Sequence, residues 1–226
     1  MGAEADLRRA ELANGSSFSF RLCYLPAGLP NESVLFDPDG FCDAEGRALS
    51  PDEEEGARFA SDCLRAEKTA LRLVARAEQT VFGLSRKLER RGADTACSGA
   101  VVSRLLDLGL LDDRRYARLW LESRIGRQAS SPVRLLAALR ARGVDREDAD
   151  SALRGALDGE TEWLVLERFM LKRRRGRGLK NGSEDFPPFD DDAARSLKYL
   201  LKSEGFSSLA IERLFDEYGS RLEAYP

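Results

Sequence analysis

The apolar positions of the chain repeat as one pattern at three places, each built around a glycine. Two leucines lie eight and four residues before the glycine, and two adjacent apolar residues lie nine and ten residues after it. The glycines are Gly92, Gly143 and Gly205; the leucines are Leu84, Leu88, Leu135, Leu139, Leu197 and Leu201; the apolar pairs are Val101/Val102, Ala152/Leu153 and Leu214/Phe215. Leucines four apart share one helix face, and a glycine after the last turn is typical of a left-handed helix end. The pattern therefore predicts a helix, a glycine turn and a second helix, three times.

An amphipathic segment precedes each predicted pair of helices and completes a three-helix module. These segments cover residues 66–78, 113–126 and 161–173. We predict a mainly α protein of tandem three-helix repeats, which stack into an elongated, curved array because one module cannot bury its apolar faces alone. The three modules are expected at 66–111, 112–159 and 160–226, with a flexible basic loop at 174–190 inside the third.

The N-terminal part has a different pattern. Residues 17–25 alternate apolar and polar side chains, as strands do, and residues 17–49 are predicted to form a small element of two or three strands. Ser50, Pro51 and Glu53 then have the sequence of a helix start, in which Ser50 caps the helix and Glu53 completes a capping box. We expect a flexible terminus at 1–16 and a small acidic, β-containing segment with a helix at 17–65.

The stretch 108–120, LGLLDDRRYARLW, joins the first module to the second. Gly109 is predicted to close one module. The adjacent Asp112 and Asp113 are residue types that bind metal ions, but the sequence identifies no further ligands, so a helix N-cap is the favoured interpretation.

The helix that follows this junction is predicted to bury a stripe of Tyr116, Leu119 and Trp120. Arg114 and Arg115 lie in its first turn, where the helix dipole disfavours a cation. We therefore expect these two arginines to have partners outside the helix.

The residue types that the chain lacks exclude most catalytic classes. Its 226 residues include no histidine, which removes histidine general bases, catalytic triads and most zinc sites. Cys23, Cys42, Cys63 and Cys97 are 19, 21 and 34 residues apart, so isolated reduced thiols are expected. No glycine-rich phosphate loop is present. We expect neither a metal nor a cofactor.

Membrane insertion and export are not expected. No run approaches the roughly 18 consecutive apolar residues of a membrane span. The first residues lack the basic-then-apolar order of a signal peptide. We expect a cytoplasmic, monomeric protein without a membrane partner.

Charge is distributed unevenly along the chain. Residues 1–65 hold 6 Lys/Arg against 13 Asp/Glu, residues 66–180 hold 25 against 16, and residues 181–226 hold 5 against 10. A basic middle between acidic ends indicates a surface that faces a polyanion. Charge alone is equally compatible with helices whose charged faces meet only solvent.

Three stretches resemble the RecX family of recombination regulators. They are LLDLGLLDDRRYARLWLESR, LLAALRARGVDREDADSAL and SLKYLLKSEGFSSLAIERLF. The first is similar to the family's junction motif, here Gly109, Asp112, Asp113, Tyr116 and Ala117. The resemblance covers about residues 66–217. It implies a small non-enzymatic protein that binds RecA and its filament on single-stranded DNA, lies in the groove of that filament, and restrains recombinase, ATPase and co-protease activities in recombination and SOS repair.

The first module departs from the family's pattern. Residues 77–80 read Ala-Glu-Gln-Thr where the family commonly has Arg-Glu-His-Ser, although Thr80 still suits an N-cap. Val81 and Phe82 stand at normally polar positions, and Gly83 replaces a usual Glu. Exposed apolar side chains at a helix start are a liability. We therefore predict that the N-terminal strand segment covers Val81 and Phe82.

Basic side chains in three parts of the modules are the candidates for contact with RecA or with DNA phosphates. They are Arg86, Lys87, Arg90 and Arg91 in the first module, Arg124, Arg127, Arg134, Arg140 and Arg142 in the second, and Lys172, Arg173, Arg174, Arg175 and Arg177 before the long loop. A solvated surface is the better interpretation of any one arginine, whereas the set favours a RecA or polyanion contact. Trp120 and Trp163 are expected in the core rather than as base-stacking platforms.

Two other functions remain open. One is a helical-repeat DNA-binding or adaptor protein whose partner is not RecA. The other, less favoured, is a divalent-metal nuclease that uses Asp112 and Asp113.

Overall fold

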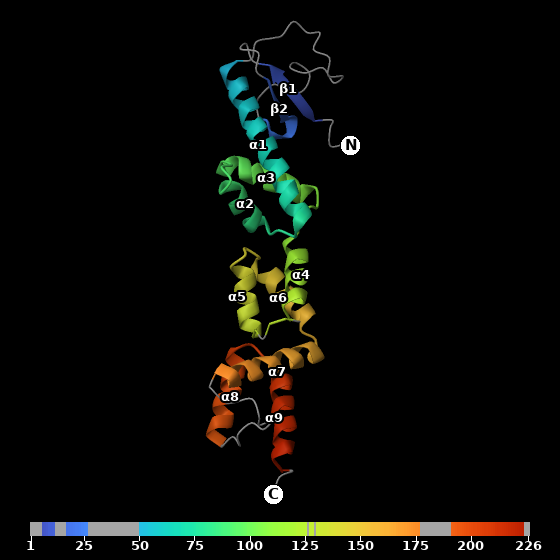
Figure 1. The fold of residues 1–226 in the computed structure, drawn as a ribbon, viewed down its shortest axis with the longest axis vertical. Helices are drawn as coiled ribbons and strands as arrows, with labels where there is room; N and C mark the ends of the chain where they lie inside the picture. The colour runs from blue at the N-terminus through green and yellow to red at the C-terminus, as the bar shows by residue number, and fades with distance from the viewer. Residues whose placement is uncertain are drawn as a thin grey trace. The chain divides into compact units, whose positions relative to one another are not determined.

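The computed structural model describes residues 6–11, 17–26, 50–125, 127–128, 130–176 and 191–223. The chain divides into two compact units, residues 1–112 and 113–226. The first unit holds strands β1 (Leu7–Glu11) and β2 (Ser17–Arg21), a short 3-10 helix (Leu22–Tyr24), α1 (Pro51–Arg76), α2 (Val81–Glu89) and α3 (Thr95–Asp107). The second holds α4 (Asp113–Ile125), α5 (Pro132–Arg140), α6 (Arg146–Ala156), α7 (Gly159–Gly176), α8 (Asp191–Ser203) and α9 (Ser208–Glu223) (Figure 1). The described fold is mainly α with helical repeats and a small N-terminal sheet, as predicted.

The N-terminal sheet differs from the prediction in its strands. β1 pairs antiparallel with β2, with Leu7 opposite Arg21 and Glu11 opposite Ser17. β1 therefore lies within residues 1–16, where a flexible terminus was expected. Its own alternation is weak, but pairing with β2 satisfies its backbone groups in a ladder. Residues 27–49, predicted to supply further strands, lie outside the described residues.

α1 begins with the predicted capping box. The Ser50 hydroxyl accepts a hydrogen bond from the Glu53 N–H at 3.3 Å, and the Glu53 carboxylate accepts one from the Ser50 N–H at 2.8 Å. The helix then runs for 26 residues, about 39 Å at 1.5 Å per residue. It crosses the boundary predicted at residues 65 and 66, because neither proline nor glycine interrupts residues 57–76. The helix of the N-terminal segment is thus also the first helix of the first module.

Each repeated glycine ends a helix in the left-handed region, as predicted. The φ angles of Gly92, Gly143 and Gly205 are 91°, 87° and 88°. The residue after each glycine donates to the carbonyl of the leucine four positions before the glycine: Ala93 to Leu88 at 3.1 Å, Val144 to Leu139 at 3.3 Å, and Phe206 to Leu201 at 3.1 Å. This bond closes a Schellman-type helix end. The leucine thus fills the core with its side chain and ends the helix with its carbonyl.

The repeated apolar residues form the cores of both units. In the first unit, Leu84, Leu88 and Val101 pack with Phe20 of the hairpin. In the second unit, one core gathers side chains of α4–α6, including Leu121 and Leu139. Another core gathers side chains of α7–α9, including Trp163, Leu201 and Leu214. Ile125 and Leu157 pack against both cores of the second unit and so connect them.

A close joint links α5 to the turn between α8 and α9. The Val133 N–H donates to the Glu204 carbonyl at 3.1 Å, and the buried Ser131 hydroxyl bonds to the Glu204 carboxylate. A Cβ on Gly205 would lie 3.1 Å from Val133 Cγ2 and 3.2 Å from Pro132 Cβ. Glycine at this position therefore permits both the left-handed backbone and the close approach.

The buried stripe of α4 differs from the prediction. Ala117 and Leu121 are fully buried, whereas Tyr116 and Trp120 are half-buried and Leu119 is 45% exposed. Ala117 and Leu121 are four residues apart and set the direction that faces the core. Leu119 lies two residues from each, on the opposite side of the helix, so its predicted burial is wrong.

The hairpin packs on α1, beside which Figure 1 draws it, rather than on the start of α2. Val81 is partly buried against the same core, but Phe82 is 46% exposed. The Arg86 guanidinium lies 5.5 Å from the centroid of the Phe82 ring. The prediction that the strand segment covers Phe82 is therefore wrong, because α1 supplies the apolar face that the hairpin needs.

The described cysteines are free thiols, but Cys63 and Cys97 are hydrogen-bonded to each other rather than isolated as predicted. Cys63 and Cys97 are buried, and Cys23 is exposed. Burial raises the pKa of the Cys63 and Cys97 thiols, which keeps both protonated and unreactive. Cys42 lies outside the described residues.

Candidate nucleic-acid and protein interaction surface

Two arginines of the predicted set meet over one tryptophan in the second unit. Trp120 and Arg124 lie one turn apart on α4, and Arg142 lies in the turn after α5. The guanidinium carbons of Arg124 and Arg142 are 5.0 and 4.8 Å from the centroid of the Trp120 ring, within cation–π range. All three side chains are half-buried, so each keeps part of its surface accessible. We call these three residues the Trp120 cluster.

Hydrogen bonds hold both guanidinium groups of the Trp120 cluster in place. Arg124 Nη1 donates to Gln128 Oε1 at 2.6 Å, and Arg142 Nη1 donates to the Ala138 carbonyl at 2.6 Å. Orientation before binding lowers the entropy that a ligand must overcome. The cluster thus offers a fixed aromatic surface and two cations to one ligand.

The other predicted arginines of the second module are more exposed and partly neutralised. Arg134 lies 3.9 Å from the Glu204 carboxylate, and Arg140 lies 4.0 Å from that of Asp150. Arg127 is exposed in the turn after α4. These side chains add less positive potential than their number suggests, because acidic groups lie beside two of them.

Four basic residues gather at the end of α2, as the sequence predicts. Arg86 covers Phe82, Lys87 Nζ donates to Gln79 Oε1 at 2.6 Å, and Arg91 Nη1 donates to the Lys87 carbonyl at 2.9 Å. Arg90 is exposed beside them. Within the described residues none of the four pairs with a carboxylate. Their charge is therefore available to an anionic partner.

The third predicted group lies at the end of α7. Lys172 is exposed and Arg173 is half-buried. Arg174 and Arg175 belong to the helix, but their side chains lie outside the described part, as does the whole of Arg177. α7 continues to Gly176, so residues 174–176, predicted as part of the basic loop, are helical, and the rest of that predicted loop lies outside the described residues.

The junction motif connects two helices, as predicted. Gly109 has a φ of 67°, and the Leu110 N–H donates to the Leu105 carbonyl at 2.9 Å. Asp112 directly precedes α4, Asp113 is its first residue, and Ala117 is fully buried.

Arg114, in the first turn of α4, donates from Nε to Asp148 Oδ1 on α6 at 2.8 Å. This contact confirms the expected partner outside the helix for Arg114. No group of three or more His, Cys, Asp or Glu side chains in the described residues is arranged to hold a metal ion. In the same residues, no helix combines the length and apolar character that crossing a membrane requires.

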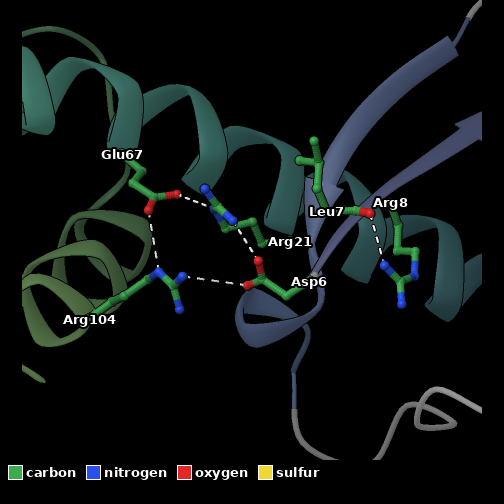
Figure 2. A network of polar contacts seen from close by, with 6 residues as sticks. All are labelled: Asp6, Leu7, Arg8, Arg21, Glu67 and Arg104. Atoms are coloured by element: carbon green, nitrogen blue, oxygen red, sulfur yellow. Dashed lines mark hydrogen bonds and ion pairs between the residues drawn. The ribbon is translucent and has the colours of Figure 1, made fainter. Parts of the chain in front are cut away.

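Figure 2 shows a charged network that the sequence did not predict. Glu67 on α1 is only 3% exposed, and its carboxylate accepts from Arg21 Nε at 2.7 Å and from Arg104 Nε at 3.3 Å. Asp6 accepts from Arg21 Nη1 at 2.5 Å and lies 3.6 Å from Arg104 Nη2. The four residues come from the hairpin, α1 and α3. The network therefore fastens the N-terminal sheet to the first helical module.

Two surface features escaped the sequence patterns. The sequence predicts Trp120 as core, whereas the ring is half-buried and carries two arginines; Arg124, one turn later, was the available signal. Arg195, Lys198, Tyr199 and Lys202 on α8 are all exposed, and none was predicted as a contact residue. Their exposure depends on which face of α8 packs against the core.

Comparison with known proteins decides the family. Residues 112–153, which include the Trp120 cluster, match the family model described as the second three-helix domain of RecX. A regulatory protein RecX from Halorhodospira halophila is 37% identical over 155 residues, covering 69% of this chain and 86% of that protein. This chain belongs to the RecX family. A regulatory protein RecX from Treponema pallidum is 39% identical over 129 residues, covering 56% of this chain and 79% of that protein.

Two solved structures support the RecX fold. A crystal structure of regulatory protein RecX has a TM-score of 0.60 at 21% identity and covers 76% of this chain and 80% of the other. RecX from Lactobacillus salivarius has a TM-score of 0.53 at 19% identity, with coverages of 71% and 98%. At these identities the similarity bears on the fold alone.

Proposed function

We propose that this RecX-family protein regulates RecA by binding the RecA filament on single-stranded DNA, and that binding mostly lowers the recombinase, ATPase and co-protease activities of the filament. Relatives of the chain carry the name regulatory protein RecX. The observation that carries the proposal is the Trp120 cluster, an aromatic ring with two cations inside the family-matched residues. Such a cluster suits an anionic partner.

Two separate candidate contact surfaces support the proposal of binding to a filament. The basic end of α2 and the Trp120 cluster belong to different units of the chain. When one molecule binds an extended partner through two weak surfaces, the second binding event is intramolecular, and the overall affinity exceeds that of either surface alone. The proposal assigns the protein no catalytic role, a monomeric state and a cytoplasmic setting, where RecA acts.

ATP hydrolysis by RecA on single-stranded DNA, measured while the protein is titrated in, tests this proposal. We expect hydrolysis to fall as the protein concentration rises. An unchanged rate at every ratio contradicts the proposal. Salt-sensitive binding to DNA with no effect on RecA would instead support a helical-repeat DNA-binding protein with another partner.

A further inference from the structure

We propose that the exposed face of α8 binds single-stranded nucleic acid by stacking a base on Tyr199. The Tyr199 side chain is 78% exposed, the largest exposed fraction among the large hydrophobic side chains of the described residues. Within those residues it forms neither a hydrogen bond nor a ring contact. An aromatic ring left open to solvent is unusual in a folded domain, since aromatic side chains gain most from burial.

Exposed basic residues precede and follow Tyr199 along α8. Arg195 lies one turn before it, Lys198 directly before it and Lys202 three residues after it. Arg195 to Lys202 spans about 10 Å at 1.5 Å per residue, about three times the ~3.4 Å of helix axis that each phosphate of one strand occupies in double-stranded DNA. One face of α8 therefore offers an aromatic surface with cations on both sides.

Two contacts position these cations. Lys198 Nζ lies 4.7 Å from the centroid of the Phe215 ring, so contact with α9 fixes the position of that ammonium group. Arg195 Nη1 lies 3.0 Å from Asp192 Oδ1 in a pair that is largely exposed on both sides. An exposed pair of this kind is weak and exchanges readily with a phosphate.

The chemistry of this face favours nucleic acid over an apolar protein partner. The apolar side of α8 points the other way, with Leu201 buried and Leu197 and Leu200 packed against the core. Tyr199 thus lies between basic residues along the helix and outside the buried leucine face. A nucleotide matches this arrangement because it carries a flat base next to an anionic phosphate, and stacking tolerates any base sequence. An acidic protein would use the cations but leave the ring without a partner.

This site deepens the proposed function and rests on it for its setting, because a regulator of a RecA–DNA filament meets single-stranded DNA. Its test needs no RecA. Fluorescence anisotropy of a labelled oligothymidylate gives the Kd of the full-length protein and of three variants: Tyr199→Phe, Tyr199→Ala and Leu209→Ala. Leu209 on α9 is 73% exposed and serves as the matched control.

We expect Tyr199→Ala to raise the Kd at least about fivefold, because stacking on one aromatic side chain contributes roughly 1–3 kcal/mol. Tyr199→Phe, which keeps the ring, and Leu209→Ala are expected to leave the Kd unchanged. An unchanged Kd for Tyr199→Ala, or an equal rise for Leu209→Ala, overturns the site. Competition with polyglutamate is a further test. If polyglutamate displaces the labelled oligonucleotide as effectively as unlabelled oligothymidylate does, the nucleic-acid site is overturned, because the surface then binds acidic proteins equally well.

The RecA assay separates this site from the proposed function. A protein that lowers RecA ATP hydrolysis, but whose Tyr199→Ala variant binds the oligonucleotide normally, removes the α8 site and leaves the proposed function standing. If the protein has no effect on RecA but Tyr199→Ala weakens oligonucleotide binding as expected, the proposed function is overturned and the α8 site stands.

Discussion

The carboxylate of Glu67, buried in α1, accepts a hydrogen bond from Arg21 on β2 at 2.7 Å. A buried carboxylate without a cation is strongly unfavourable, and here both Arg21 and Arg104 reach it. This contact joins residues 46 positions apart and holds the N-terminal hairpin on the first helical module.

Replacing Glu67 by glutamine should lower the free energy of unfolding by about 2 kcal/mol or more, because two guanidinium groups lose their anionic partner. Chemical denaturation measures the loss, and hydrogen exchange across Ser17–Arg21 should show weaker protection. Glu54→Gln is the matched control on the same helix, since its pair with Arg58 is exposed on both sides and contributes about 0.5 kcal/mol. Equal losses for the two variants would mean that the buried network does not hold the hairpin.

Asp6 makes the stability of this network depend on pH. Burial by itself raises the pKa of Asp6, but hydrogen bonds from Cys23 and Arg21 and the positive charges of Arg21 and Arg104 outweigh it and lower the pKa. A carboxylate with a lowered folded-state pKa stabilises the fold above its ordinary value of 3.8, and this stabilisation is lost as the pH falls through the folded-state pKa.

The wild-type protein should therefore be more stable than Asp6→Asn at neutral pH, and the gap should close below about pH 4. Urea denaturation of both proteins along a pH series measures the gap. A gap that stays constant into the acid range would show that the charge of Asp6 is not what stabilises the network.

Alanine substitutions at Gly92 and Gly205 distinguish the cost of backbone strain from the cost of steric crowding. Both have a left-handed φ, but a Cβ meets no atom within 4 Å at Gly92 and lies 3.1–3.2 Å from Val133 and Pro132 at Gly205. Gly92→Ala should lower the free energy of unfolding by about 1 kcal/mol, the cost of the left-handed backbone for alanine. Gly205→Ala should cost about 1 kcal/mol more, because α5 must shift. Thermal denaturation of both variants compares the two losses of stability. A smaller loss for Gly205→Ala than for Gly92→Ala would show that α5 shifts without cost.

Local sequence patterns predicted the features that depend on neighbours along the chain. The helix end at Gly92 needs only Leu88 four residues earlier, and the start of α1 needs only Ser50 and Glu53. The residue types and their spacing along the chain determine such an interaction completely. These features could therefore be predicted before any fold was known.

Contacts between distant segments were beyond those patterns. Glu67 meets Arg21 and Arg104 across 46 and 37 positions, and Arg142 reaches Trp120 only after the second module has folded. Leu119 was misassigned for a related reason, since periodicity offers several apolar faces and tertiary packing selects one. The candidate contact residues were found as a set, but their grouping around Trp120 required the structure.

The Trp120 cluster should contribute to the salt dependence of binding to single-stranded DNA. Replacing Arg124 and Arg142 together by glutamine should weaken binding and reduce the slope of log K against log salt by about 1.4, since each phosphate contact on a single strand contributes roughly 0.7. Arg146→Gln is the control, because Arg146 is 83% exposed in the same module and lies 3.6 Å from the Asp150 carboxylate. The same slope for the double variant and the wild type would mean that these arginines do not contact phosphate.

Co-sedimentation with RecA filaments assembled on single-stranded DNA tests the central claim most directly. The protein should pellet with the filament at concentrations at which it stays in the supernatant with free RecA, and should bind the filament more tightly than the DNA alone. The Arg124/Arg142 double variant should need a higher concentration to pellet. A protein that remains in the supernatant with filaments at every concentration, or that binds them no better than naked DNA, would contradict regulation of RecA through its filament.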